Sequence, residues 1–175
     1  MHESAKGLKP GLNDSDQALL AWACRNLIEL VVFVKYVLQS VRNAETFSKD
    51  GIVDLHQMIH VARNLQKQEL PEQDGEADTV MEFANALKEL AGISTDKYLL
   101  AGNLAGTVGK AAEYAAIHKI CSKYVHPTAF SILDAYEEGI VSVVNWAFFQ
   151  RGVVYNAEIC KDIALYCVAA KPQAV

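Results

Sequence analysis

The residue types best suited to chemistry lie in one segment, where Tyr114, His118, Ser122 and His126 follow one another at intervals of four. Residues four apart lie along one face of a helix, so the Ser122 hydroxyl would lie within hydrogen-bond reach of either imidazole. A base beside a hydroxyl is the minimum that nucleophilic or general acid–base catalysis requires. In the structural alternative, Ser122 donates to the carbonyl of residue 118 and His126 caps the end of its helix.

A second polar pattern interrupts the apolar run over residues 19–38. At about 100° per residue, Trp22, Arg25, Glu29 and Tyr36 lie on one narrow stripe of a helix. Arg25 and Glu29 have the i, i+4 spacing of a helical ion pair. The stripe either faces solvent or points into an internal pocket, where it would bind a small anionic ligand. The ligand-binding residues that we expect for such a pocket are Arg25, Glu29, Tyr114, His118 and Lys119.

A histidine pair suggests a metal site. His56 and His60 have the spacing with which two imidazoles bind one metal ion from a single helix, and His118 or His126 would supply a third ligand. No Glu-x-x-His pair supports them, and both lie toward the edge of the apolar face that Leu55 marks. A solvated helix flank is the preferred interpretation, and a metal-binding bundle stays an alternative.

The glycine-rich segment over residues 102–110 resembles a phosphate-binding loop only superficially. Position 104 is Leu, and Ala111 replaces the Ser or Thr that would hold magnesium. Its small residues favour close helix packing instead. We therefore expect neither a bound metal nor a cofactor.

The elements that must position these residues are helices, because no region alternates apolar and polar residues as a half-buried strand does. We predict a single-domain all-α bundle of five to six helices over residues 14–170, with a flexible N-terminal segment over 1–13 and a tail over 171–175. Gly92 should end one helix in a left-handed conformation, Gly51 should weaken or start another, and Gly152 should separate the last two. Helical segments are expected over residues 14–41, 44–67, 77–90, 110–126, 133–150 and 153–169, with a short one from about residue 97.

The composition restricts the classes of protein to consider. Of the 175 residues, 51% are hydrophobic and 21% charged, which excludes intrinsic disorder as the global state, and the net charge of −5 disfavours non-specific nucleic-acid binding. The four cysteines lack Cys-x-x-Cys spacing and residues 1–13 lack a signal-peptide core, so we expect a cytoplasmic protein. Charged residues within 19–38 would be costly in lipid, which favours a buried helix over a membrane span. The apolar fraction indicates a homodimer.

Two strings carry a resemblance to known proteins. CSKYVHPTAFSIL over residues 121–133, preceded by Tyr114, and RNLIELVVFVKYV over 25–37 resemble a family of uncharacterised bacterial helical proteins with a Ser-x-x-x-His-Pro-like motif at the end of the fourth helix. That family is similar to the HEPN superfamily of nucleotide-binding helical domains. The resemblance covers about residues 20–165 and implies a HEPN-like helical bundle. Many HEPN proteins are metal-independent ribonucleases whose motif is Arg, four to six residues, then His, contributed twice in a symmetric dimer.

The resemblance places the motif histidine at His126. No Arg lies at the matching positions, and the nearest substitute, Lys119, offers charge without the planar fork that grips phosphate at two points. In the ribonuclease hypothesis His126 is therefore the general acid or base, Ser122 positions it and Arg25 stabilises phosphate charge. The preferred hypothesis is a binding or regulatory module with a polar pocket for a small anionic ligand. A ribonuclease acting on RNA and a metal-binding bundle are its alternatives.

Overall fold

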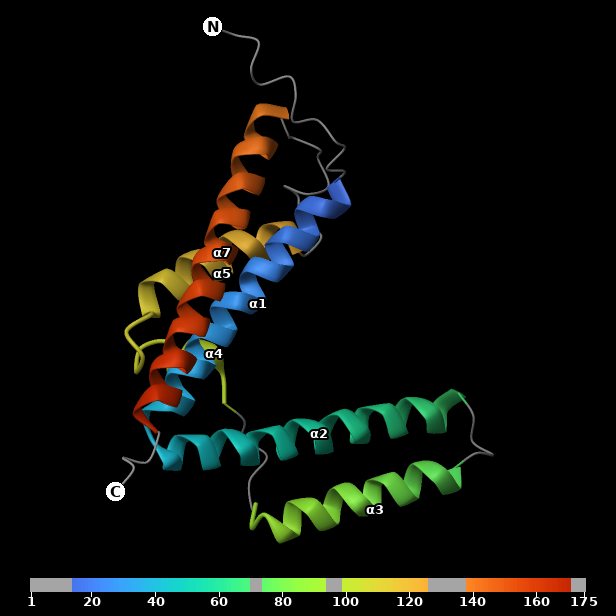
Figure 1. Ribbon diagram of the computed structural model, residues 1–175. Helices are drawn as coiled ribbons and strands as arrows, with labels where there is room; N and C mark the ends of the chain where they lie inside the picture. The colour runs from blue at the N-terminus through green and yellow to red at the C-terminus, as the bar shows by residue number, and fades with distance from the viewer. Residues whose placement is uncertain (1–13, 70–73, 94–98, 126–137, 171–175) are drawn as a thin grey trace, which may run out of the picture.

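The computed structural model describes residues 14–69, 74–93, 99–125 and 138–170, and every regular element among them is a helix (Figure 1). The prediction of an all-α bundle is confirmed. His126, the N-terminal segment and the C-terminal tail lie outside the described residues. The helices are α1 (Asp14–Gln39), α2 (Val41–Glu69), α3 (Asp74–Leu90), α4 (Ala101–Leu104), α5 (Ala111–Val125) and α7 (Glu138–Ala169).

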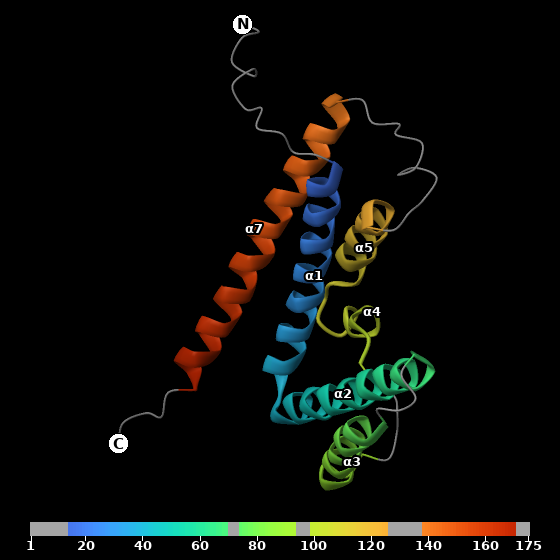
Figure 2. The same ribbon diagram turned by 90° about the vertical axis from the view of Figure 1, so that its right-hand side faces the viewer.

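Three helices form the body of the molecule, with α1 packed against both α5 and α7 (Figure 2). α7 runs in the same direction as α1, since a Cβ added at Gly152 would lie 3.5 Å from Leu27 and, farther along, Lys35 pairs with Asp162. α2 and α3 pack against each other as a two-helix arm that crosses the end of α1 (Figure 2). Arg25, Glu29, Tyr114 and His118 therefore lie in the body, whereas His56 and His60 lie on the arm.

The core of the body is built around α1. Of the six largest fully buried side chains among the described residues, α1 supplies four: Cys24, Ile28, Val31 and Val32. Its opposite face is exposed, however, with Leu19, Trp22 and Leu30 at 61%, 53% and 46% of their full accessible area. The buried side chains form two clusters. The larger contains Ala21, Cys24, Ile28, Val31, Cys121, Phe148, Tyr155 and Ile159, and the smaller contains Val32, Ala101, Leu104 and Ala105.

The expected break at Gly152 is wrong, because α7 is one continuous helix of 32 residues. Gly152 lies on the side of α7 that faces α1, and a Cβ there would reach van der Waals distance of Leu27 Cδ1. Glycine weakens an isolated helix by about 1 kcal/mol relative to alanine. Tertiary packing over the rest of α7 overrides that cost. The glycine therefore marks close helix packing and not a boundary.

Other boundaries follow local capping. α2 begins at Val41 because the Ser40 hydroxyl accepts a hydrogen bond from the Asn43 amide at 3.1 Å, and Gly51 lies inside the helix instead of starting it. Gly92 has a φ of 64°, which confirms the predicted left-handed helix end. The predicted short helix is displaced to Ala101–Leu104, where the Leu99 amide donates to the buried Asp50 carboxylate.

α1 also has the length and composition of a membrane-spanning helix. Its segment Gln17–Gln39 has a mean hydropathy of 1.5, and it is the one such helix in the described part of the chain. The core helix of a water-soluble protein meets the same criteria. Here α1 contacts α2, α4, α5 and α7, and it pairs charged side chains with residues of α5 and α7.

Candidate functional site

Four side chains from α1 and α5 form what we call the polar cluster: Arg25, Glu29, Tyr114 and His118. Arg25 Nε lies 3.4 Å from Glu29 Oε1, and His118 Nε2 lies 3.9 Å from the same oxygen. The three charged or titratable side chains are partly buried, with 25%, 29% and 35% of their area exposed. The structure therefore brings together the two polar patterns that are 85 or more residues apart in the sequence.

Tyr114 anchors the cluster on α5. Its ring stacks on the His118 imidazole, with centroids 5.4 Å apart, and it packs against both buried clusters of the body. Its ring edge lies 3.4 Å from where a Cβ would stand at Gly102, which is van der Waals distance, so the ring packs against α4. Burial, and then the Glu29 charge, raise the pKa of the Tyr114 phenol, which keeps its proton for donation.

Ser122 does not act with His118 as a nucleophile and base. Its hydroxyl donates to the His118 backbone carbonyl at 2.6 Å, while the His118 imidazole faces Glu29. This confirms the structural alternative for Ser122, because a hydroxyl that bonds back to the preceding turn satisfies a helical carbonyl. Lys119 is exposed on α5, and within the described residues no ion pair links it to the polar cluster.

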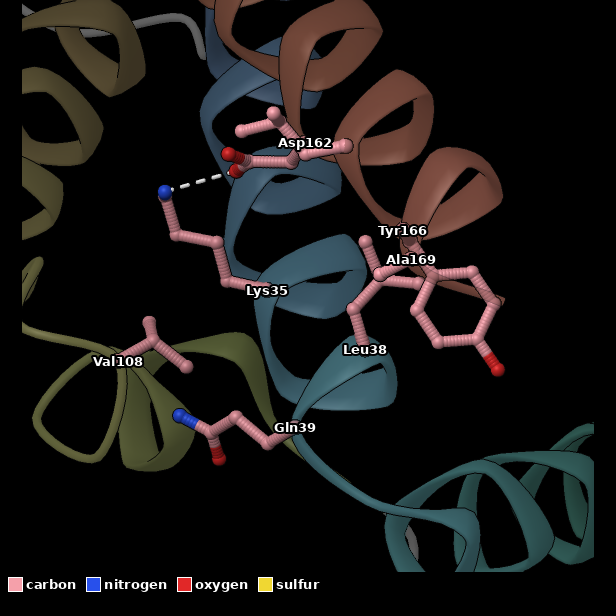
Figure 3. Close-up of a pocket in the computed structure, with 8 residues that line it drawn as sticks. Lys35, Leu38, Gln39, Val108, Asp162, Tyr166 and Ala169 are labelled. Carbon is pink, nitrogen blue, oxygen red and sulfur yellow. Dashed lines mark hydrogen bonds and ion pairs between the residues drawn. The ribbon is translucent and has the colours of Figure 1, made fainter. Parts of the chain in front are cut away.

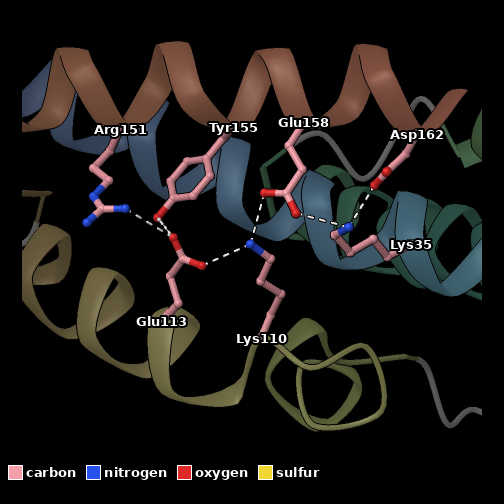
Figure 4. A network of polar contacts seen from close by, with 7 residues as sticks. All are labelled: Lys35, Lys110, Glu113, Arg151, Tyr155, Glu158 and Asp162. Atoms are coloured by element: carbon pink, nitrogen blue, oxygen red, sulfur yellow. Dashed lines mark hydrogen bonds and ion pairs between the residues drawn. The ribbon is translucent and has the colours of Figure 1, made fainter. Parts of the chain in front are cut away.

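A second polar assembly, the charge network, joins α1, α5 and α7 (Figure 4). Lys110 Nζ lies 2.9 Å from both Glu113 and Glu158, and Lys35 Nζ lies 2.9 Å from Glu158 and 2.8 Å from Asp162. Three cations face three carboxylates, so the network is electrically balanced. Its members are Lys35, Lys110, Glu113, Arg151, Tyr155, Glu158 and Asp162.

Tyr155 connects the charge network to the core. Its ring is fully buried and its hydroxyl donates to Glu113 Oε1 at 3.0 Å, where Arg151 also approaches at 3.4 Å. Burial, and then the charge of Glu113, raise the pKa of this phenol, so it stays a hydrogen-bond donor. The hydroxyl would be costly to bury without that carboxylate.

The pKa values of two lysines and two glutamates in the charge network move in the direction that favours their charged forms. Burial alone would raise the pKa of Glu113, but hydrogen bonds from Lys110 and Tyr155 outweigh it and lower this pKa. The same balance lowers the pKa of Glu158, through Lys110 and Lys35. Burial opposes the ammonium groups of Lys35 and Lys110, yet their carboxylate partners raise both pKa values. The ion pairs of the network therefore hold α1, α5 and α7 together.

The spacing of residues in the sequence does not predict this network. Lys110 and Glu113 at i, i+3 were a visible signal, as were Glu158 and Asp162 at i, i+4. Each pair is common on solvated helices, however, and the contacts that join them cross 48 or 127 residues of sequence. Only the packing of α1, α5 and α7 brings them together.

An open groove of about 490 Å³ borders the charge network, between the C-terminal halves of α1 and α7 (Figure 3). Its charged lining residues, Lys35 and Asp162, pair with each other, and Gln39 donates to the Thr107 carbonyl at 3.4 Å. The rest of its lining is mainly apolar: Leu38, Val108, Leu165, Tyr166 and Ala169. The groove is therefore less suited to an anion than the polar cluster is.

The two histidines of the metal-binding alternative, on α2, bind different partners. His56 Nε2 bonds the Asn85 side chain of α3 at 2.9 Å, whereas His60 Nδ1 meets its neighbour Asn64 at 3.2 Å. Within the described ranges no group of three or more His, Cys, Asp or Glu side chains is arranged to hold a metal ion. The two imidazoles thus have separate amide partners on the arm.

Comparison with known proteins adds no assignment, because no protein-family model, no curated protein and no solved structure matches this chain. The proposed function therefore depends on side-chain geometry.

Proposed function

We propose that the protein is a non-catalytic binding module that takes a small anionic ligand at the polar cluster. The observation that supports this is the single Glu29 carboxylate shared between Arg25 and His118, at 3.4 Å and 3.9 Å. Charge-assisted hydrogen bonds are usually shorter, at about 2.7–2.9 Å. The contacts of Glu29 are therefore weak, and the anionic group of a ligand could take its place between Arg25 and His118.

The residue types of the cluster suit a phosphate or carboxylate group. Arg25 presents a planar fork of donors, which binds such a group at two points. Tyr114 is a protonated phenol, and the His118 imidazole adds a donor from the same face of α5. The ligand must displace Glu29, so we expect weak affinity, with a Kd on the order of 1 mM for a simple anion.

Titration of the ¹⁵N-labelled full chain with inorganic phosphate tests this proposal by NMR, at constant ionic strength set with chloride. We expect saturable shifts for the Arg25 Nε–H group and for backbone amides near residues 25–29 and 114–118. Arg25→Ala should raise the Kd at least tenfold. The matched control is Arg42→Ala, because Arg42 is exposed on α2, away from the cluster. Shifts that do not saturate, or equal losses in both variants, would contradict the proposal.

Ribonuclease activity is the second candidate. Arg25 and His118 lie on either side of Glu29, and RNA cleavage requires a cation that binds phosphate and a side chain that acts as acid or base. We expect no cleavage of RNA by the wild type, because a net charge of −5 weakens RNA capture. If His126 only caps its helix, His126→Ala should lower the free energy of unfolding by about 0.5–2 kcal/mol. Metal-independent cleavage that disappears in both His126→Ala and Arg25→Ala would replace the binding proposal with the catalytic one.

A further inference from the structure

The solvent-facing side of α7 carries an apolar seam in a strict heptad pattern. The spacing alternates between three and four residues over three heptads: Trp146, Phe149, Val153, Asn156, Cys160, Ile163 and Cys167. All seven side chains are exposed, including Trp146 at 59%, Phe149 at 52% and Val153 at 54%. A repeat of this kind is the pattern with which two helices pack along each other.

The seam is distinct from the face with which α7 joins the body. The inward face holds the buried Phe148, Tyr155 and Ile159, which lie on the other side of the helix. α7 therefore has two apolar faces, of which the described residues cover one. Three uncharged residues flank the seam along one edge: Gln150, Ala157 and Ala164.

We propose that a second copy of this chain docks on the seam, so that the two α7 helices pack along each other about a two-fold axis. A stable interface of standard size takes about 800 Å² from each partner, and the seam offers seven exposed side chains over residues 146–167. The seam is also self-complementary, being apolar apart from Asn156 near its middle.

The distribution of side-chain volumes favours an antiparallel pair. Large residues occupy the N-terminal half of the seam, where the Trp146 and Phe149 rings stack with centroids 5.8 Å apart, and the smaller Cys160 and Cys167 occupy the C-terminal half. A parallel pair would set each ring against its own copy and each thiol against a thiol. An antiparallel pair sets Phe149 against the partner's Cys160 and so fills the space evenly.

Sedimentation equilibrium of the full chain tests the interface. The wild type should sediment at twice the 19.2 kDa chain mass at micromolar concentration. Val153→Glu should raise the dimer Kd at least a hundredfold, while far-UV circular dichroism stays helical. Val61→Glu on α2 is the matched control, since Val61 is as exposed at 58%, and it should stay dimeric. A monomeric wild type, or a dimer that Val153→Glu leaves intact, would overturn the proposal.

Disulfide cross-linking with diamide tests the orientation. In a Cys167→Ser background, Phe149→Cys should form a covalent dimer through Cys160 of the partner, and the background chain alone should not. Efficient cross-linking of the background chain through Cys160 would instead show a parallel pair and overturn the antiparallel arrangement. Monomeric Val153→Glu should still bind phosphate, so failure of the dimer and failure of the anion site are distinguishable.

Discussion

The charge network and the polar cluster use the same kinds of side chain to join α1 to its neighbours, yet the lysine contacts of the network are shorter than the contacts of the cluster. In the network, each lysine has two carboxylate partners at 2.8–2.9 Å. In the cluster, Glu29 is shared by Arg25 and His118 at 3.4 Å and 3.9 Å. The network has equal numbers of cations and carboxylates. In the cluster, the Glu29 carboxylate lies between an arginine and an imidazole.

This difference separates a structural role from a binding role. The short contacts of the network leave no place for a ligand without loss of a partner between helices. The longer contacts at the cluster cost less to replace, because weak ion pairs contribute little to stability. We therefore propose that the network holds the helices in place and that the cluster binds a ligand.

The largest expected difference is in hydrogen exchange, and it concerns the middle of α1. Residues 27–34 include the buried Ile28, Val31 and Val32, so their amides should exchange only through global unfolding, with an opening free energy of at least about 5 kcal/mol. Amides of the exposed arm helix α3 should exchange much faster. Hydrogen exchange measured by NMR checks this order. Rapid exchange over residues 27–34 would contradict the central position of α1.

Glu113→Gln should have the next largest effect. It removes the charge that Lys110 and Arg151 face and that Tyr155 bonds, so the free energy of unfolding should fall by about 2 kcal/mol. Urea denaturation measures the change. Glu82→Gln on α3 is the control, because Glu82 is exposed, and it should change stability by less than about 0.5 kcal/mol. Equal effects in the two variants would show that the network does not stabilise the fold.

Acid should weaken the charge network. The pKa values of Glu113 and Glu158 are lowered in the folded state, so their stabilisation is complete above the unfolded pKa near 4.5 and is lost as the pH falls through the folded values. From about pH 5 downward, we expect the free energy of unfolding to decrease as these groups take up protons. Urea denaturation across this range should show a smaller loss for Glu113→Gln. An identical pH dependence would contradict the assignment.

Glu29→Gln should have the smallest effect on stability. Its contacts are long and its side chain is partly exposed, so we expect a change within about 0.5 kcal/mol in the free energy of unfolding. The same substitution would thus have clearly different effects in the two assemblies. A loss as large as that of Glu113→Gln would make the cluster a second structural network.

The sequence predicted the local parts of this arrangement and missed the long-range ones. Arg25 and Glu29 lie on one helical turn, so their pairing follows from spacing alone, as does the bond from Ser122 back to residue 118. The lysines of the network meet carboxylates on α7, which no spacing rule connects. The helix end that we predicted at Gly152 is wrong for the same reason, because the glycine makes a long-range contact with α1 and does not end a helix.

The affinity of Glu29→Gln for inorganic phosphate tests the central claim most directly. Glutamine keeps the shape of the side chain but removes the negative charge that competes with the ligand for Arg25 and His118. Measured by the same titration, with Glu82→Gln as control, the Kd should fall about tenfold, which is about 1.4 kcal/mol. An unchanged or weaker affinity in Glu29→Gln would contradict the claim that the polar cluster binds an anion in place of Glu29.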